Sequence, residues 1–256
     1  MDLKNEKNKG LLALGLYIIL FSLGVVVVSL LVEVLLMLLG ADLTDPKVYN
    51  ISAALINLLS YVVLSGVLIF LYRKEIVTDF KLLKSYRLKG VIIKVLAGFG
   101  IFYAISLLGN YLISNVDYYG NLIYKIFKLG EFNTTSDNQA SIEAMLEGPS
   151  FWMMFLAAGF LGPLCEELVF RKAMFSICKT KEMGILVSSL LFGFIHITSS
   201  LLLFDGVTIF LMVFPYIVSG VALAIVYLKG DRNIMIPTIA HMLSNILSMI
   251  MIVIGL

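Results

Sequence analysis

The stretch FWMMFLAAGFLGPLCEELVFRKAMFSIC at residues 151–178 decides the fold. A helix crosses a bilayer with about 20 mostly apolar residues, and this run is long enough to do so. It nevertheless carries Glu166, Glu167 and Arg171, and ionisable side chains inside an apolar crossing are costly and mark a functional site by default. Pro163 also interrupts the run, because a proline frees a backbone carbonyl that a neighbouring group must satisfy. We therefore expect a membrane helix, or two half-helices, that bears part of a buried site.

The rest of the chain is also apolar. Of its 256 residues, 60% are hydrophobic and 14% are charged, and the mean hydropathy is +1.00. Soluble domains carry about a quarter charged residues, so the composition excludes a soluble globule, a disordered chain and a fibrous repeat. A net charge of +2 is too small to indicate nucleic-acid binding. Cys165 and Cys178 provide neither a disulfide framework nor a metal-binding pair.

Seven apolar runs predict an all-α fold, a polytopic membrane helical bundle of about seven to eight transmembrane helices. An eighth crossing would come from a split at Gly162-Pro163 or from residues 118–132. The first run is too long for a cleavable signal peptide, whose apolar region spans about 7–15 residues, so we expect an uncleaved span. We divide the chain into residues 1–150, with N-terminal helices and loops, and residues 151–256, a helical core, within one integral membrane domain. The seven runs are 11–40, 52–72, 91–114, 151–178, 184–204, 207–228 and 234–256.

Basic residues indicate the orientation of these helices. With the N-terminus in the cytoplasm, 16 of the 19 Lys and Arg residues fall on the cytoplasmic side. We therefore expect a cytoplasmic N-terminus and an outer C-terminus. The basic stretch 73–90 predicts either an amphipathic helix on the inner leaflet or a plain loop. Within the polar stretch 115–150, a short helix is expected to begin near Gln139, with Ser136 or Asp137 as its cap.

Polar residues occur at similar depths in three of the apolar runs. Both histidines of the chain, His196 and His241, lie inside predicted crossings, and Asn245 follows His241 at i+4 on one helix face. With a rise of 1.5 Å per residue, these residues and Glu166 all lie about 10–20 Å from the inner surface. Three helices thus bring polar groups to one level, as a buried site requires. The alternative is a structural polar network that holds the helices together.

The two adjacent glutamates are expected to differ. Glu167 and Arg171 are spaced i,i+4 in the favourable order and can form an ion pair on one helix face. Glu166 is rotated by about 100° from Glu167, outside that register, so it is the free carboxylate. Phe192 lies one turn before His196 on the same face.

Three motifs follow one another on successive apolar runs. They are EExxxR, FxxxH and HxxxN, present as EELVFR at 166–171, FGFIH at 192–196 and HMLSN at 241–245. Each motif alone is weak, but their order makes the set highly specific. The chain resembles, over roughly residues 150–250, the CAAX protease and bacteriocin-processing family, also called the Abi or type II CAAX prenyl endopeptidase family.

This resemblance implies an intramembrane endopeptidase. It assigns Glu166 and His196 to the activation of a water molecule, and His241 and Asn245 to an oxyanion hole. Such chemistry is reasonable, because hydrolysis needs a base, a proton donor for the leaving amine and donors for the developing oxyanion. The supporting residues are Glu167, Arg171 and Phe192.

Two other mechanisms stay open at this stage. Glu166, His196 and His241 offer the three ligands that a catalytic zinc site requires, although the chain has no HExxH motif; otherwise no cofactor and no metal is expected. Cys165 is a possible nucleophile, but it points away from the face of Glu166. We interpret Cys165 as an apolar packing residue.

The sequence does not identify the substrate. Family analogy offers prenylated CAAX-type C-termini, bacteriocin or pheromone precursors, and membrane-protein regulators, and we favour peptide precursors in a bacterial cell membrane. The expected partners are a peptide or protein substrate and the lipid bilayer, without nucleic acid, and the oligomeric state is open. A function of another class is a non-proteolytic immunity protein or scaffold that binds a partner in the membrane.

Overall fold

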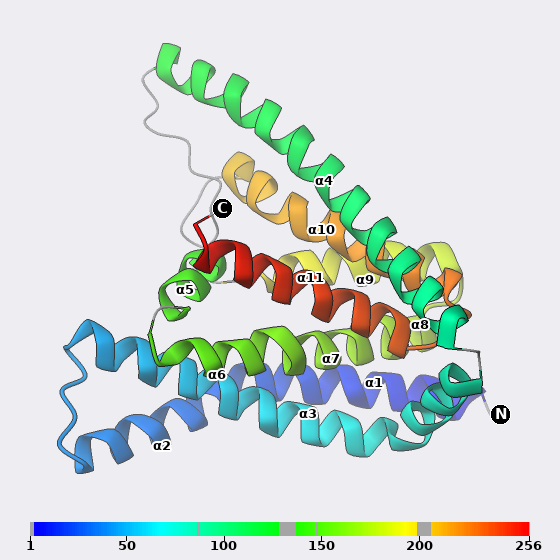
Figure 1. Ribbon diagram of the computed structural model, residues 1–256, viewed down its shortest axis with the longest axis horizontal. Helices are drawn as coiled ribbons and strands as arrows, with labels where there is room; N and C mark the ends of the chain where they lie inside the picture. The colour runs from blue at the N-terminus through cyan, green and yellow to red at the C-terminus, as the bar shows by residue number, and fades with distance from the viewer. Residues whose placement is uncertain (1–2, 86–87, 128–136, 147, 199–205, 256) are drawn as a thin grey trace.

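A computed structural model describes residues 3–85, 88–127, 137–146, 148–198 and 206–255. These residues form helices joined by turns, with no strand among them. Most of the helices run side by side along the long axis of the molecule (Figure 1). The all-α bundle predicted from the sequence is therefore confirmed.

The helices follow the predicted runs, with three short π-helical segments (η) inserted. The N-terminal helix consists of α1 (Leu3–Ile19), η1 (Leu20–Gly24) and α2 (Val25–Leu38). Next come α3 (Pro46–Ser85), α4 (Leu88–Phe127) and α5 (Asp137–Met145). One continuous helix, here called the central helix, is built from α6 (Ser150–Leu156), η2 (Ala157–Leu161), α7 (Gly162–Glu167), η3 (Leu168–Ala173) and α8 (Met174–Ile177). The chain continues with α9 (Lys181–Ile195), α10 (Gly206–Lys229) and α11 (Met235–Val253).

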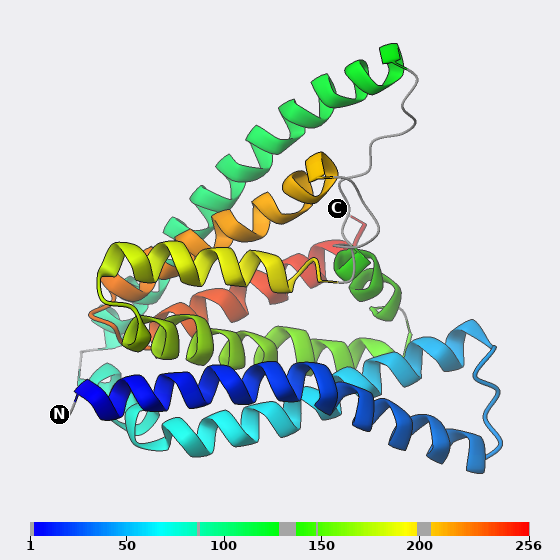
Figure 2. The same ribbon diagram turned by 180° about the vertical axis from the view of Figure 1, so that it is seen from behind.

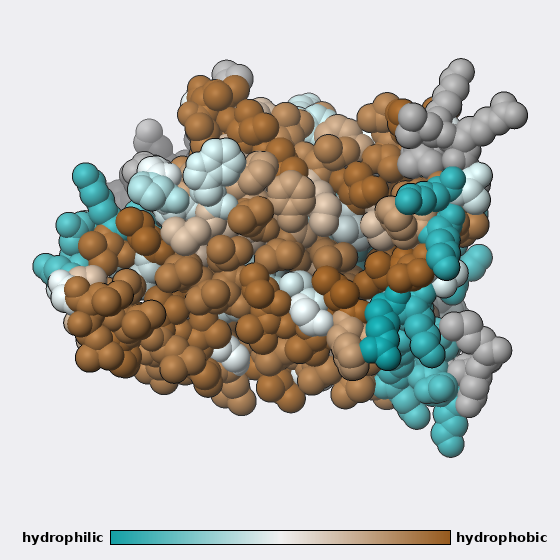
Figure 3. Space-filling view, turned by 60° about the horizontal axis from the view of Figure 1, so that its bottom comes forward, coloured by the Kyte–Doolittle hydropathy of each residue, from teal (hydrophilic) through white to brown (hydrophobic). Residues whose placement is uncertain are grey.

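Six helices of the described residues are long and apolar enough to cross a membrane. One face of the molecule is apolar along its length, with hydrophilic residues gathered at the two ends (Figure 3). The protein is therefore a multi-pass integral membrane protein. The run predicted at 184–204 forms α9, whose 15 residues make it shorter than the other crossings; residues 199–205 lie outside the described part. The six spans are Lys4–Leu38, Pro46–Ser85, Ile92–Gly109, Ser150–Ile177, Met212–Lys229 and Met235–Val253.

Three local predictions can be compared with the structure. Residues 73–85 are helical, but they continue α3 instead of forming a separate helix or a loop. Residues 118–127 belong to α4 and are not a separate eighth crossing, while 128–132 lie outside the described residues. The short polar helix is confirmed as α5, which begins at Asp137, two residues before the expected start. Asp137 is therefore the first helical residue and not the cap, and Ser136 lies outside the described residues.

The central helix is not divided at its glycine–proline pair, contrary to the half-helix expectation. Its backbone widens into the π turn η2, where the N–H of Gly162 donates to the carbonyl of Ala157, five residues earlier. Pro163 has no N–H, so in this register the carbonyl of Ala158 lacks its backbone donor. The side-chain amide of Asn245 in α11 donates to that carbonyl at 2.9 Å. The carbonyl freed by proline is thus satisfied by a neighbouring helix, which keeps the central helix continuous.

The central helix lies in the middle of the bundle. On one side α1 packs against η3 and α8, and on the other α11 packs against α7 and η2. Seen from behind, α1 runs along the central helix, whereas α2 and the start of α3 extend beyond it (Figure 2). The polar residues of the central helix are therefore enclosed by neighbours from both ends of the sequence.

Candidate active site

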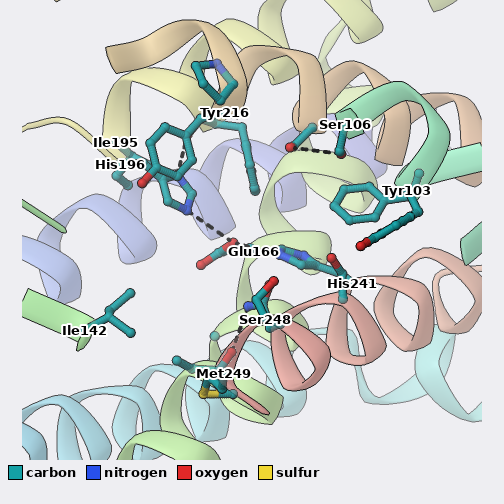
Figure 4. A pocket seen from close by; sticks show the side chains of 18 of the residues that line it. Tyr103, Ser106, Ile142, Glu166, Ile195, His196, Tyr216, His241, Ser248 and Met249 are labelled. Atoms are coloured by element: carbon teal, nitrogen blue, oxygen red, sulfur yellow. Dashed lines mark hydrogen bonds and ion pairs between the residues drawn. The ribbon is translucent and has the colours of Figure 1, made fainter. Parts of the chain in front are cut away.

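The three predicted site residues from different helices meet in the bundle. Glu166 Oε2 of α7 lies 4.0 Å from His196 Nε2, at the end of α9, and 3.9 Å from His241 Nε2 of α11. Glu166 and His241 are buried, with 7% and 5% of their surface exposed. All three point into one space (Figure 4). The structure thus brings together residues separated by up to 75 positions, as the matched depths predicted.

The hydrogen bonds of His196 indicate which ring nitrogen carries the proton. Its Nδ1 lies 2.6 Å from the backbone carbonyl of Phe192, one turn earlier. Because a carbonyl can only accept, Nδ1 donates, and a neutral ring presents the Nε2 lone pair toward Glu166. A carboxylate oxygen and a lone pair cannot bond directly, but a water molecule can donate to both. The 4.0 Å separation of the two atoms suits such a bridging water.

Two aromatic rings hold the imidazole of His196. Phe192 lies at 4.6 Å between centroids, tilted by 43°, and Tyr216 of α10 stacks at 4.5 Å with 20° between the planes. The contact with Phe192 agrees with their shared helix face. Tyr216 was not identified from the sequence, since nothing in the apolar run of α10 indicates which side chain faces α9.

Glu167 differs from Glu166 as expected. It pairs with Arg171, whose Nε lies 3.1 Å from Glu167 Oε2, and both side chains are fully buried. The predicted i,i+4 pair is therefore confirmed. Arg171 also lies over the ring of Phe192 at 5.3 Å and donates to Ser188 at 3.4 Å.

Glu167 also makes a contact that the sequence did not predict. Its Oε1 lies 3.1 Å from Nδ1 of His241 in α11. A carboxylate paired with arginine accepts hydrogen bonds only, so Nδ1 carries a proton. Glu167 therefore fixes both the orientation and the protonation of one nitrogen of His241. This role resembles that of the residues that orient metal-bound or catalytic histidines in other proteins.

A cavity of about 650 Å³ adjoins these residues, within the range of about 300–1,000 Å³ typical of ligand sites. Its wall contains Glu166, His196, His241 and Asn245, together with aromatic, methionine and serine side chains. The four predicted catalytic side chains thus share one cavity. Other lining residues include Tyr17, Tyr61, Tyr103, Ser106, Leu107, Ile142, Ala158, Tyr216, Ser219, Ser244, Ser248, Met249 and Ile252.

The two remaining sequence hypotheses concern cysteine and metal. Cys165 is fully buried in the apolar core and is not among the lining residues, which agrees with a packing role. In the part of the chain that the structure describes, no group of three or more His, Cys, Asp or Glu side chains is arranged to hold a metal ion. Glu166, His196 and His241 converge, with the carboxylate oxygen about 4 Å from each imidazole nitrogen.

Comparison with known proteins gives a match to the C-terminal part of the chain. Residues 148–247 match the family model described as type II CAAX prenyl endopeptidase Rce1-like. This segment contains all three motifs, and the resemblance drawn from them is confirmed as a match to this family model over residues 148–247. The family implies a membrane endopeptidase of the CAAX type.

Two curated relatives are similar over parts of their length. An uncharacterized protein of Mycoplasma capricolum subsp. capricolum is 34% identical over 97 residues, which are 38% of this chain and 26% of the relative. A protein of Bacillus subtilis named "Putative membrane peptidase YdiL" is 27% identical over 135 residues, 52% of this chain and 48% of the relative. The matches thus span about a quarter and about half of these relatives. No solved structure matches the chain significantly.

Proposed function

We propose that the protein is an intramembrane endopeptidase that cleaves a peptide or protein precursor, with Glu166 and His196 activating the attacking water. The observation that carries this proposal is the facing pair formed by Glu166 Oε2 and His196 Nε2, 4.0 Å apart on the cavity wall. Both atoms accept hydrogen bonds, and a water molecule between them has its two protons engaged and a lone pair left for attack. The family match of residues 148–247 supports the same reaction class.

The proposed reaction needs no covalent intermediate. As the water oxygen bonds to the substrate carbonyl carbon, one of its protons passes to the carboxylate of Glu166. The tetrahedral intermediate then collapses, the C–N bond breaks, and the same proton passes to the leaving amine. His196 keeps the water oriented through the second hydrogen bond.

The developing oxyanion is proposed to meet His241 and Asn245. Nδ1 of His241 already donates its proton to Glu167. Nε2 of His241 can therefore donate to the oxyanion only when both ring nitrogens are protonated. Such an imidazolium balances the buried charge, since the site would then hold two carboxylates, one guanidinium and one imidazolium. One N–H of the Asn245 amide bonds Ala158, and an amide has a second N–H for the oxyanion. The proposed oxyanion hole thus consists of two donors, one N–H of His241 and one N–H of Asn245.

The test is cleavage of candidate precursors by purified protein in detergent, followed by mass spectrometry. Bacteriocin and pheromone precursors encoded near the gene are the first candidates. Wild-type protein is expected to cleave at one internal bond, and Glu166→Gln to cleave none while melting at the wild-type temperature. If Glu166→Gln cleaves at the wild-type rate, the proposal is wrong. If cells that carry Glu166→Gln are still protected against the bacteriocin, a non-proteolytic immunity function is favoured.

A zinc-dependent mechanism is the second candidate. Glu166, His196 and His241 line one cavity, although their arrangement in the described structure is not that of a metal site. Purified protein is expected to remain active in 1,10-phenanthroline or EDTA under the metal-independent proposal. Activity that is lost with chelator and restored by zinc alone would establish the metalloprotease instead. In that case His241 would be a zinc ligand and could not serve the oxyanion.

A further inference from the structure

We propose that the cavity receives its substrate from the side of the membrane opposite to the basic end of the bundle. The substrate is then an uncharged segment of an exported or membrane-inserted polypeptide. The basic end is defined as the end where α1 begins, α3 ends, and the α8–α9 and α10–α11 turns lie (Figure 1). This inference rests on the proposed function, because it names the substrate of the same site.

The direction of the cavity is the first argument. On α11 its wall runs from His241 to Ile252, about 16 Å along the helix at 1.5 Å per residue, and away from the basic end. On the central helix the wall runs from Glu166 back to Ala158, in the same direction. Ile142 of α5, at the opposite end of the bundle, also contributes to the wall. The reactive side chains therefore lie at the inner end of a cavity that extends outward.

The basic end is closed by packed side chains. Leu168, Val169 and Phe170 follow Glu166 on the central helix, toward the basic end. Each of them has 2% or less of its surface exposed. They belong to one apolar core with Ile236 of α11. Since protein interiors are packed as densely as organic crystals, this core blocks the path along the central helix in the described part of the chain. The hollow beside Ile236, between α4, α10 and α11, holds only about 110 Å³ and is lined by a different set of residues.

Polar contacts reinforce this closure. Asp79 of α3 accepts from the backbone N–H of Ile234 at 3.0 Å and forms an ion pair with Lys172 at 3.0 Å. Asn233 donates to the backbone carbonyl of Asp79 at 2.8 Å. These bonds tie α3, η3 and the start of α11 together on the basic side of the site. A substrate approaching from there would have to break a partly buried charged network.

Access from the other side is favoured by exposed wall residues. Leu107 of α4 is 52% exposed, and Ser248 of α11 is exposed; both line the cavity. Within the described residues, the cavity thus reaches the surface between α4 and α11, in the half away from the basic end. That opening lies away from the basic end, so the segment enters from that side of the membrane.

The charge of the lining indicates the kind of segment. Among the described lining residues Glu166 is the only charged side chain besides the histidines, and none is Lys or Arg. A bond close to a free C-terminus would bring a second carboxylate into the cavity beside Glu166, with no Lys or Arg among the described lining residues to pair with it. The lining therefore favours an internal, uncharged segment over a chain end.

Thiol labelling in whole cells tests the direction of access. In a Cys178→Ser background, in which the buried Cys165 remains, Ser248→Cys places a thiol on the cavity wall. The matched control, Lys179→Cys, places one at the exposed basic end. A membrane-impermeant sulfonated maleimide is expected to label Ser248→Cys in intact cells, and Lys179→Cys only after permeabilisation.

The opposite outcomes overturn the proposal. Labelling of Ser248→Cys only after permeabilisation, labelling of both positions from the same side, or no labelling of Ser248→Cys under either condition contradicts outward access. The assay requires no turnover, so its failure is distinct from a failure to cleave precursors. In detergent, where both faces are accessible, a lysine or a free carboxylate placed beside the cleaved bond of an accepted precursor should abolish its cleavage. Undiminished cleavage would refute the uncharged-segment assignment.

Discussion

The N-terminal helix and the central helix are both membrane spans, yet they are built in opposite ways. The best apolar window of the N-terminal helix has the higher mean hydropathy, 2.8 against 1.6, but only 6% of its residues are buried, against 61% in the central helix. Lipid is as apolar as leucine, so no hydrophobic force drives leucine-rich surfaces together within a membrane. Burial therefore follows polar and small residues, and the less apolar helix occupies the centre.

The contact between the two helices illustrates the same rule. The first half of the N-terminal helix makes the main contact with the central one, in part through small residues. Gly10 lies so close to Ser176 and to the backbone of Ala173 that a Cβ there would clash with both, and Ala13 is fully buried. Beyond that point, in α2, Val32 is the one buried residue. The substitutions below test whether polar partners and close packing, more than hydropathy, set the role of each helix.

The largest effects are expected at the two neighbouring glutamates of the central helix. Glu166→Gln should abolish turnover and leave the melting temperature unchanged, because it removes the base and leaves the Glu167–Arg171 ion pair intact. Glu167→Gln should instead lower the free energy of unfolding by about 3–5 kcal/mol, because it leaves Arg171 unpaired in the interior. Some turnover should remain, since the amide oxygen of Gln can still accept from His241.

Peptide cleavage and thermal unfolding in detergent measure both effects. Inactivity of Glu167→Gln with normal stability, together with an active Glu166→Gln, would reverse the roles of the two residues. The two variants therefore distinguish a residue that acts as the base from an adjacent residue that supports the structure.

Asn245 joins the central helix to α11 and is proposed to serve the oxyanion as well. Asn245→Ala should lower kcat by about 10²–10³-fold with little change in KM, as for other oxyanion donors. It should also lower stability by about 1–3 kcal/mol, because the carbonyl of Ala158 loses its donor. Asn245→Asp should lower kcat at least as much as Asn245→Ala if the new carboxylate is ionised. A wild-type kcat in Asn245→Asp would mean that this carboxyl group is protonated or that residue 245 orients His241.

A double-mutant cycle separates the two roles of Asn245. Pro163→Ala restores an N–H that can reach Ala158 in the π register. In that background Asn245→Ala should cost less stability but the same factor in kcat. A kcat that recovers together with stability would assign Asn245 to helix joining alone.

The sequence predicted what depends on one helix at a time. The spans, the Glu167–Arg171 pair and the shared depth of Glu166, His196 and His241 all follow from spacing along a helix. Contacts between helices depend on how each one is rotated about its own axis, which spacing does not determine. For this reason the contact of Glu167 with His241 and the Ala158 hydrogen bond of Asn245 appeared only in the structure.

Tyr216 belongs to the same class of unpredicted contacts and has a smaller expected effect. Loss of an aromatic contact costs about 0.5–1.5 kcal/mol. If the stack only orients His196, Tyr216→Leu should lower kcat by about 2- to 12-fold, as that free energy implies, without changing KM, and Tyr216→Phe should restore it. Equal losses in the Leu and Phe variants would instead assign a role to the hydroxyl group.

The smallest effect is expected on the lipid-facing part of the N-terminal helix. Leu31 of α2 is 67% exposed, whereas Leu168 of the central helix is fully buried, so the same substitution samples the two environments. Leu168→Ala should lower the free energy of unfolding by about 2–5 kcal/mol, because it leaves a cavity that the packed core cannot fill. Leu31→Ala should change it by less than about 0.5 kcal/mol, since lipid or detergent occupies the vacated volume. Unfolding in one detergent, with cleavage measured in parallel, compares the two directly. Equal destabilisation would mean that α2 is covered by protein, for example by a second copy of the chain. The most apolar helix would then be buried as well, contrary to the contrast drawn above.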